Sequence, residues 1–107
     1  MARKSAGVDR RSSGEAMLEL QIRALKLPLG WVQYAPIPGR RYRIDRAWPE
    51  QKLGIEVEGG VHTIRAQWEH DCRRNNDMLL AGWRIFRLTS TMIKTGESIP
   101  LLERLLK

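Results

Sequence analysis

Apolar residues recur at helical spacing near the start of the chain and at alternate positions through its middle. Within residues 12–27, Leu18, Ile22 and Leu25 are separated by four and three residues, so they share one face of a helix. Glu15 falls on the same stripe. This spacing predicts a helix over residues 12–27 that packs one side against the rest of the protein.

Two strand-like segments follow, at residues 41–48 and 53–60, and the four residues 49–52 separate them. Loops of this length join antiparallel strands and are most often built on a type I turn. The segments therefore predict a β-hairpin. Apolar residues at alternate positions of its second strand point to one face, where they can pack against a helix.

The register of the hairpin follows from its loop. If Trp48 and Leu53 close the hairpin, antiparallel pairing brings Asp45 opposite Glu56, and opposed residues share a face of the sheet. Alternation adds Glu58 to that face. The sequence thus predicts three carboxylates close together on one side of the hairpin.

The remaining segments complete the element order. We expect a short strand near 31–34, a loop and a helix within 61–82, a strand at 83–89 and a leucine-rich helix at 98–107. The candidates for burial in the helix of 61–82 are Trp68, Cys72, Met78 and Leu79. Helices that alternate with strands in this way predict an α/β fold, with a mixed β-sheet flanked by helices.

Composition and charge add a partner to this picture. The 107 residues suit one domain, which we place at 12–107 after a flexible basic arm at 1–11. The net charge is +7 and the sequence pI is about 10.3, which favours a polyanionic partner, with nucleic acid as the first candidate. The candidate phosphate contacts are Arg40, Arg41, Arg43, Arg73 and Arg74.

The same composition narrows the cellular setting. No apolar run is long enough to cross a bilayer, so we expect no membrane association. The single cysteine, Cys72, leaves no internal disulfide to form. We expect an intracellular, cytoplasmic protein.

Carboxylates grouped on a sheet repel one another unless something neutralises them. A Mg²⁺ or Mn²⁺ ion bound by Asp45, Glu56 and Glu58 would do so, since both ions prefer oxygen ligands and also bind substrate phosphates. In the alternative interpretation, Glu56 and Glu58 lie on a solvent-exposed face and pair with Arg43 and Arg41. The glycines at 59–60, which permit close approach of a ligand, favour the metal.

The segments "YRIDRAWPEQKLGIEVEGGVH" and "EHDCRRNNDMLLAGWRIFRL" resemble the PD-(D/E)XK nuclease superfamily, and in particular its small members related to the very short patch repair endonucleases. The resemblance covers roughly residues 13–92. It implies a restriction-endonuclease-like core in which Asp45, Glu56 and the main-chain carbonyl of Val57 bind the catalytic metal. It also implies a glutamate from the first helix, with Glu15 favoured and Glu19 as the alternative.

The chain departs from the superfamily at one position that matters. Glu58 occupies the place of the lysine that usually positions the attacking water. Glu58 itself could hold a second metal or position a water. His62 resembles the histidine that follows the glycines in the related repair enzymes, and a histidine can act as an acid or a base near neutral pH.

These features predict a Mg²⁺- or Mn²⁺-dependent DNA endonuclease with Glu15, Asp45, Glu56, Glu58 and His62 in its site. A homodimer would supply two cuts where a duplex or branched substrate needs them. The rival hypothesis is a nucleic-acid-binding module that keeps the fold without catalysis, as the missing lysine suggests. A third hypothesis is a basic structural protein of a larger assembly.

Overall fold

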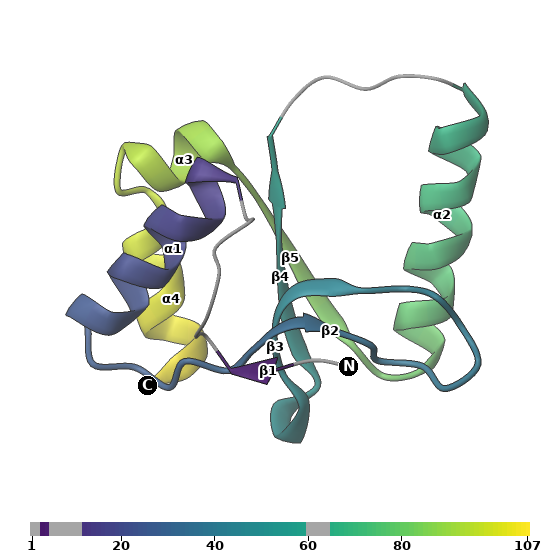
Figure 1. The fold of residues 1–107 in the computed structure, drawn as a ribbon, viewed down its shortest axis with the longest axis horizontal. Helices are drawn as coiled ribbons and strands as arrows, with labels where there is room; N and C mark the ends of the chain where they lie inside the picture. The colour runs from purple at the N-terminus through teal and green to yellow at the C-terminus, as the bar shows by residue number, and fades with distance from the viewer. Residues whose placement is uncertain (1–2, 5–11, 60–64) are drawn as a thin grey trace.

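A computed structural model describes residues 3–4, 12–59 and 65–107 of the chain (Figure 1). The strands are β1 (Arg3–Lys4), β2 (Trp31–Tyr34), β3 (Ile44–Trp48), β4 (Leu53–Glu58) and β5 (Arg84–Thr89). The helices are α1 (Ser13–Ala24), the 3₁₀ turn η1 (Pro49–Gln51), α2 (Arg65–Leu80), α3 (Ser90–Lys94) and α4 (Ser98–Leu106). The expected elements occur in the expected order, and β1 and α3 are additions that the sequence did not suggest; β1 lies within the segment 1–11 that was expected to be a flexible arm.

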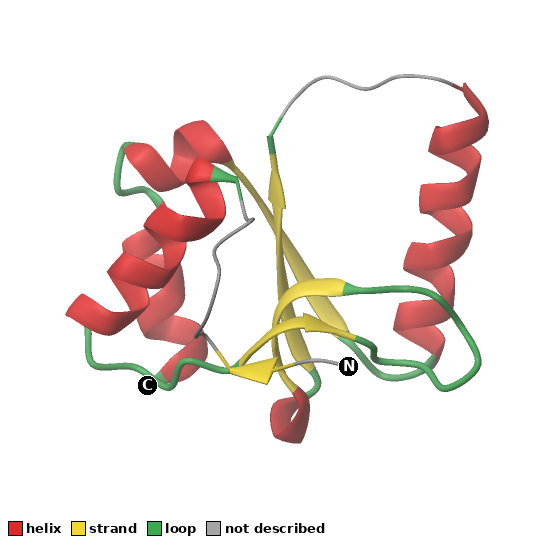
Figure 2. Cartoon of the chain, in the orientation of Figure 1, coloured by secondary structure: helices red, strands yellow, loops and turns green. Residues whose placement is uncertain are grey.

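The five strands form one mixed sheet in the order β1-β2-β3-β4-β5 (Figure 2). Neighbouring strands are antiparallel except β4 and β5, which are parallel because the α2 crossover connects them. In the β3–β4 hairpin, Trp48 pairs with Leu53 and Arg46 pairs with Ile55. The predicted register is therefore confirmed from Trp48 back to Arg46, whereas the predicted pairing of Asp45 with Glu56 is not formed.

Three helices, α1, α3 and α4, cover one face of the sheet (Figure 1). The main core lies beneath them and is built from Leu18, Ile22, Leu53, Ile55, Leu88, Ile93 and Leu102, each at most 1% exposed. Val57 packs at its edge. Alternate residues of β4 thus fill the core, as the hairpin pattern predicts, and leave Glu56 and Glu58 for the other face.

Helix α1 begins with a capping box, in which Ser12 and Glu15 bond to each other's backbone amides. It ends at Ala24, earlier than predicted, because Lys26 takes a left-handed conformation with φ of 57°. Its first turn approaches β4 and α3 closely at Gly14. A methyl group there would lie 2.7 Å from Ser90 Oγ and 2.9 Å from Val57 Cγ1.

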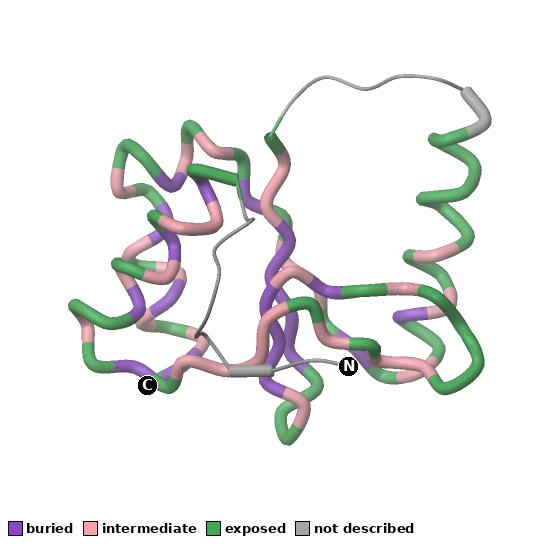
Figure 3. Tube along the Cα trace, viewed as in Figure 1, coloured by how far each residue is buried: buried purple, intermediate pink, exposed green. Residues whose placement is uncertain are grey.

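The opposite face of the sheet is only partly covered. A small core of Ile44, Ala47, Met78 and Trp83 joins the C-terminal end of α2 to the sheet, and the rest of the helix is largely exposed (Figure 3). The predicted burial of Trp68, Cys72 and Leu79 is wrong, since Trp68 and Leu79 are 63% and 60% exposed and Cys72 is exposed. Their helical spacing could not reveal that this side of α2 has no neighbour among the described residues.

Candidate active site

A cleft of about 410 Å³ lies between the uncovered face of the sheet and α2. Its lining combines four acidic side chains with three arginines, and includes two amides from α2. The lining residues are Arg43, Asp45, Glu56, Val57, Glu58, Gly59, Gln67, Asp71, Arg74, Asn75, Ile85 and Arg87. Four of the residues that the sequence nominates for the site, Asp45, Glu56, Val57 and Glu58, therefore line one cleft.

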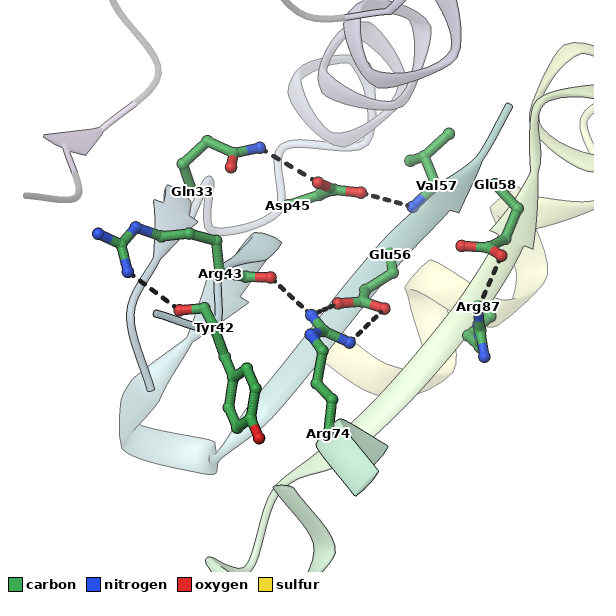
Figure 4. A network of polar contacts seen from close by, with 9 residues as sticks. All are labelled: Gln33, Tyr42, Arg43, Asp45, Glu56, Val57, Glu58, Arg74 and Arg87. Atoms are coloured by element: carbon green, nitrogen blue, oxygen red, sulfur yellow. Dashed lines mark hydrogen bonds and ion pairs between the residues drawn. The ribbon is translucent and has the colours of Figure 1, made fainter. Parts of the chain in front are cut away.

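Asp45 lies where β3 separates from β4. The backbone amide of Val57 donates a 2.8 Å hydrogen bond to Asp45 Oδ2, and Gln33 Nε2 donates a 3.1 Å bond to Oδ1. The Asp45 carboxylate thus continues the strand pairing with a side-chain oxygen. In Figure 4 it points toward Gln33 and Val57, whereas the Glu56 carboxylate points toward Arg74.

Glu56 is the most enclosed acid of the cleft, at 8% exposure. Both of its oxygens accept hydrogen bonds from the Arg74 guanidinium, which approaches from α2 (Figure 4). Arg74 Nη2 also donates a 2.6 Å bond to the backbone carbonyl of Arg43. The arginine therefore neutralises Glu56 and joins α2 to the sheet.

Tyr42 lies beside this ion pair, with the Arg74 guanidinium 6.0 Å from the centre of its ring. Its hydroxyl donates a 2.7 Å hydrogen bond to Asp77 Oδ2. That bond to a carboxylate, together with partial desolvation, raises the pKa of Tyr42 above its ordinary value of 10.0. Tyr42 and Asp77 form a second polar connection between α2 and the segment before β3.

Glu58 is more exposed than Glu56 and pairs with Arg87 of β5 at 2.8 Å. The alternative interpretation paired Glu56 and Glu58 with Arg43 and Arg41 across the hairpin. Instead, their partners are Arg74 and Arg87, which come from the two elements that follow the hairpin. Partners from such distant segments could not be inferred from strand alternation.

The remaining predicted acids and the histidine lie elsewhere. Glu15 serves the capping box of α1 and is not among the residues that line the cleft. Glu19 forms a 2.6 Å ion pair with Arg46, whose side chain is 3% exposed, so the alternative glutamate has a structural role. His62 lies outside the described residues.

Among the candidate phosphate contacts, Arg43 and Arg74 line the cleft. Arg40 and Arg41 are exposed in the segment before it, and Arg73 is exposed on α2.

Sequence reasoning did not assign site roles to Gln33, Gln67, Asp71, Asn75 and Arg87. Gln67, Asp71 and Asn75 recur every fourth residue on α2, the spacing of one helix face, and this is the signal that could have identified them.

The donor groups of the cleft suit a hard divalent cation. Carboxylate oxygens are the ligands that Mg²⁺ and Mn²⁺ prefer, and Mg²⁺ is commonly bound by only one or two carboxylates together with waters and substrate phosphates. Asp45 and Glu56 provide two. Within the described residues, no three acidic, histidine or cysteine side chains gather closely enough to hold one ion. The prediction that Asp45, Glu56 and Glu58 form one cluster around a metal is therefore wrong in this structure, in which each of the three bonds to a different protein group.

Comparison with known proteins identifies a fold relative. No protein-family model matches the chain, and no curated protein matches it. Among solved structures, it is similar to the catalytic domain of the homing endonuclease I-Bth0305I, with a TM-score of 0.59 and 14% identity over 88% of this chain and 92% of that one. The chain therefore shares its α/β fold with that catalytic domain.

In the described part of the chain, no helix has the length and apolar character needed to span a membrane.

Proposed function

We propose that this protein is a divalent-metal-dependent DNA endonuclease whose active site is the cleft between β4 and α2. The observation that carries the proposal is the gathering of Asp45, Glu56 and Glu58 beside Arg43, Arg74 and Arg87 in one cleft, on a fold shared with a nuclease catalytic domain. Acidic oxygens suit a metal, and arginines suit the phosphates of DNA.

Asp45, Glu56 and the main-chain carbonyl of Val57 would hold Mg²⁺ or Mn²⁺. Such an ion, when bound, lowers the pKa of a water and offsets negative charge on the scissile phosphate. The β3–β4 hairpin fixes the backbone that carries these ligands, through the paired residues next to Asp45. Preorganised ligands of this kind reduce the reorganisation needed at the reaction.

Other side chains would serve the water and the leaving group. Glu58, whose side chain is 41% exposed, can accept a proton from a water or hold a second ion. His62 can act as an acid or a base near neutral pH. Glu15 would contribute a further carboxylate from α1 if its capping bonds rearrange when the site is filled.

DNA would bind along the arginines at the mouth of the cleft, chiefly Arg40, Arg41 and Arg43 before β3 and Arg73 and Arg74 on α2. Guanidinium groups form paired hydrogen bonds with phosphates. One such cleft cuts one strand. We therefore expect a homodimer on substrates that require two cuts.

A DNA-binding module without catalysis is the second candidate. It is supported by the pairing of Asp45, Glu56 and Glu58 with protein groups and by the glutamate at the usual lysine position. Such a module would bind DNA with a steep dependence on salt and would not require a metal.

The decisive experiment is cleavage of labelled duplex, nicked, flapped and four-way junction DNA in Mg²⁺, Mn²⁺ or EDTA. Wild type is compared with Asp45→Ala and Glu56→Ala, and with Arg104→Ala on α4 as a matched surface control. We expect metal-dependent cleavage by wild type and the control, and at least a hundredfold slower cleavage by the two acid variants, as loss of a key electrostatic group commonly produces. Absence of cleavage with every ion, while all four proteins bind DNA equally, would establish the binding module instead.

A further inference from the structure

Arg74 occupies the carboxylate that the proposed metal would need. Its guanidinium bonds to both oxygens of Glu56, and the Glu56 side chain is only 10% exposed. A guanidinium and a divalent cation are both positive and both seek the same lone pairs. They therefore compete for Glu56, and metal binding must weaken or displace the arginine.

Displacement of Arg74 is sterically feasible because few other elements pack around its part of α2. The Arg74 side chain is 18% exposed, its helix is largely exposed, and the cleft lies in front of it. Its remaining hydrogen bond is to the Arg43 carbonyl, at the same opening. An arginine at this position can turn from Glu56 to a phosphate that enters the cleft.

Such an exchange conserves charge pairing at both ends. Before binding, Arg74 satisfies Glu56. After binding, a DNA phosphate satisfies Arg74 and the metal satisfies Glu56, so neither charge is left buried and unpaired. Loss of one partner from an enclosed ion pair is otherwise costly.

We propose that Arg74 exchanges between Glu56 and a DNA phosphate, so that DNA and the divalent metal bind cooperatively. The inference rests on the proposed function, because it concerns the regulation of the same site. Metal affinity is held low in free protein and rises when the phosphate backbone draws Arg74 away. By linkage, the metal raises DNA affinity by the same factor.

Arg74 is distinguished from the other arginines of this surface by its partner. Arg87 pairs with the more open Glu58, and both side chains are more than 40% exposed. Arg73, the preceding residue on α2, pairs with Glu69 of its own helix at 4.0 Å. Because Arg73 belongs to the proposed DNA surface, the control is Arg104, an exposed arginine of α4 that has the same charge and does not line the cleft.

The test measures Mn²⁺ affinity by electron paramagnetic resonance, with and without a phosphorothioate duplex that resists hydrolysis. Wild type, Arg74→Ala, Arg74→Lys and Arg104→Ala are compared. Without DNA, we expect Arg74→Ala to bind Mn²⁺ about tenfold more tightly than wild type, within the usual range of coupling between sites. Arg104→Ala should match wild type within about twofold, as expected for an exposed charge away from the cleft.

Addition of the duplex should tighten Mn²⁺ binding about tenfold in wild type and much less in Arg74→Ala. The remaining increase in that variant measures the metal that the phosphates recruit directly. Arg74→Lys keeps the charge but not the paired hydrogen bonds, so its affinity should lie between the two. If Arg74→Ala does not fold, Arg74→Lys provides the test, because the lysine keeps a positive charge beside Glu56. In this variant α2 also keeps its contact through Met78 and the hydrogen bond from Tyr42 to Asp77.

The results separate the two proposals. Equal or weaker Mn²⁺ binding in Arg74→Ala, or an equal effect of DNA in both proteins, overturns the exchange and leaves the nuclease proposal intact. If none of the proteins binds Mn²⁺ with or without DNA, the metal site itself fails, and both proposals fail with it.

Discussion

Asp45 has a structural task in addition to the chemical one proposed for it. It accepts the backbone amide of Val57 at the point where β3 and β4 stop pairing, and it also accepts a bond from Gln33. The backbone of Gln33 is itself left-handed, with φ of 52°. One carboxylate thus holds together β2, β3 and β4 at the opening of the cleft.

Asp45→Ala should therefore lower the free energy of unfolding even without a metal. A hydrogen bond to a charged group contributes about 1.5–3 kcal/mol, and we expect a loss in that range by urea denaturation in EDTA. Glu58→Ala is the matched control. Its ion pair is exposed on both sides, so its loss should cost less than about 1 kcal/mol. Equal effects of the two substitutions would show that Asp45 does not support the strands.

Tyr42 provides a residue-scale measure of the connection between α2 and the sheet. Its pKa is raised by the bond to Asp77, so the protonated hydroxyl is favoured in the folded state. The resulting stability is fully present below pH 10.0, the ordinary value, and is lost as the pH rises through the higher pKa of the folded protein.

Asp77→Asn should return the pKa of Tyr42 toward 10.0, because it removes the negative charge that opposes ionisation. The chain has two tyrosines. The Tyr34→Phe background therefore isolates Tyr42 in an alkaline titration followed by absorbance. An unchanged midpoint in Asp77→Asn would mean that the hydroxyl is not bonded to Asp77 in solution.

At the scale of elements, the position of α1 depends on a glycine, which has no side chain. Gly14 allows the first turn of the helix to lie against Val57 of β4 and Ser90 of α3. In an exposed helix, a change from glycine to alanine stabilises by about 1 kcal/mol. Here an added methyl group must displace two neighbours that belong to different elements.

Gly14→Ala should consequently destabilise the protein, by about 1–3 kcal/mol, the usual cost of overpacking. Ser13→Ala, on the exposed side of the same turn, should change stability by no more than about 0.5 kcal/mol. Thermal and urea unfolding of the two variants give the comparison. A stabilised Gly14→Ala would indicate that α1 lies farther from β4 than the structure shows.

The same elements show what a sequence can reveal. The hairpin register could be predicted because the loop length and the alternation of β4 are local properties, and they correctly directed Leu53 and Ile55 to the core. The packing of α2 against the sheet does not depend on local sequence. Its spacing of apolar residues is helical, yet whether Trp68 or Leu79 finds a neighbour depends on how the whole helix stands against the sheet.

The candidate site shows the same limit of prediction from sequence. Glu56 and Glu58 were placed together by strand geometry, but their partners Arg74 and Arg87 belong to segments 18 and 29 residues later in the chain. The position of Asp45 was predicted, whereas its bond to Val57 depends on where the two strands separate. The positions of the acidic residues on the hairpin could be inferred from the sequence, whereas their hydrogen-bond and ion-pair partners on other elements could not.

At the scale of the whole molecule, charge and architecture are linked. The net charge is +7, and the three-helix layer of α1, α3 and α4 covers the face of the sheet opposite the cleft (Figure 1). The proposed DNA surface therefore lies on the α2 side, which the sheet presents without a full helical cover.

DNA binding should reflect this asymmetry in its salt dependence. Loss of one phosphate contact reduces the slope of log affinity against log salt by about 0.9, so Arg43→Ala at the cleft should show this reduction. Arg104→Ala on α4 removes the same charge from the other face and should leave the slope unchanged. Fluorescence anisotropy over a range of salt concentrations gives both slopes. Equal slopes in the two variants would contradict a binding surface on the α2 side.

The contact between α1 and the last helices has a consequence for synthesis on the ribosome. Gln21 bonds to Ser98, 77 residues later in the chain, and Leu18 and Ile22 are covered in part by residues of α3 and α4. At about 5–20 residues per second, translation of that interval takes on the order of 4–15 s. During this time the apolar stripe of α1 lacks the cover that α3 and α4 provide, and we expect chaperones that bind short hydrophobic segments to recognise it.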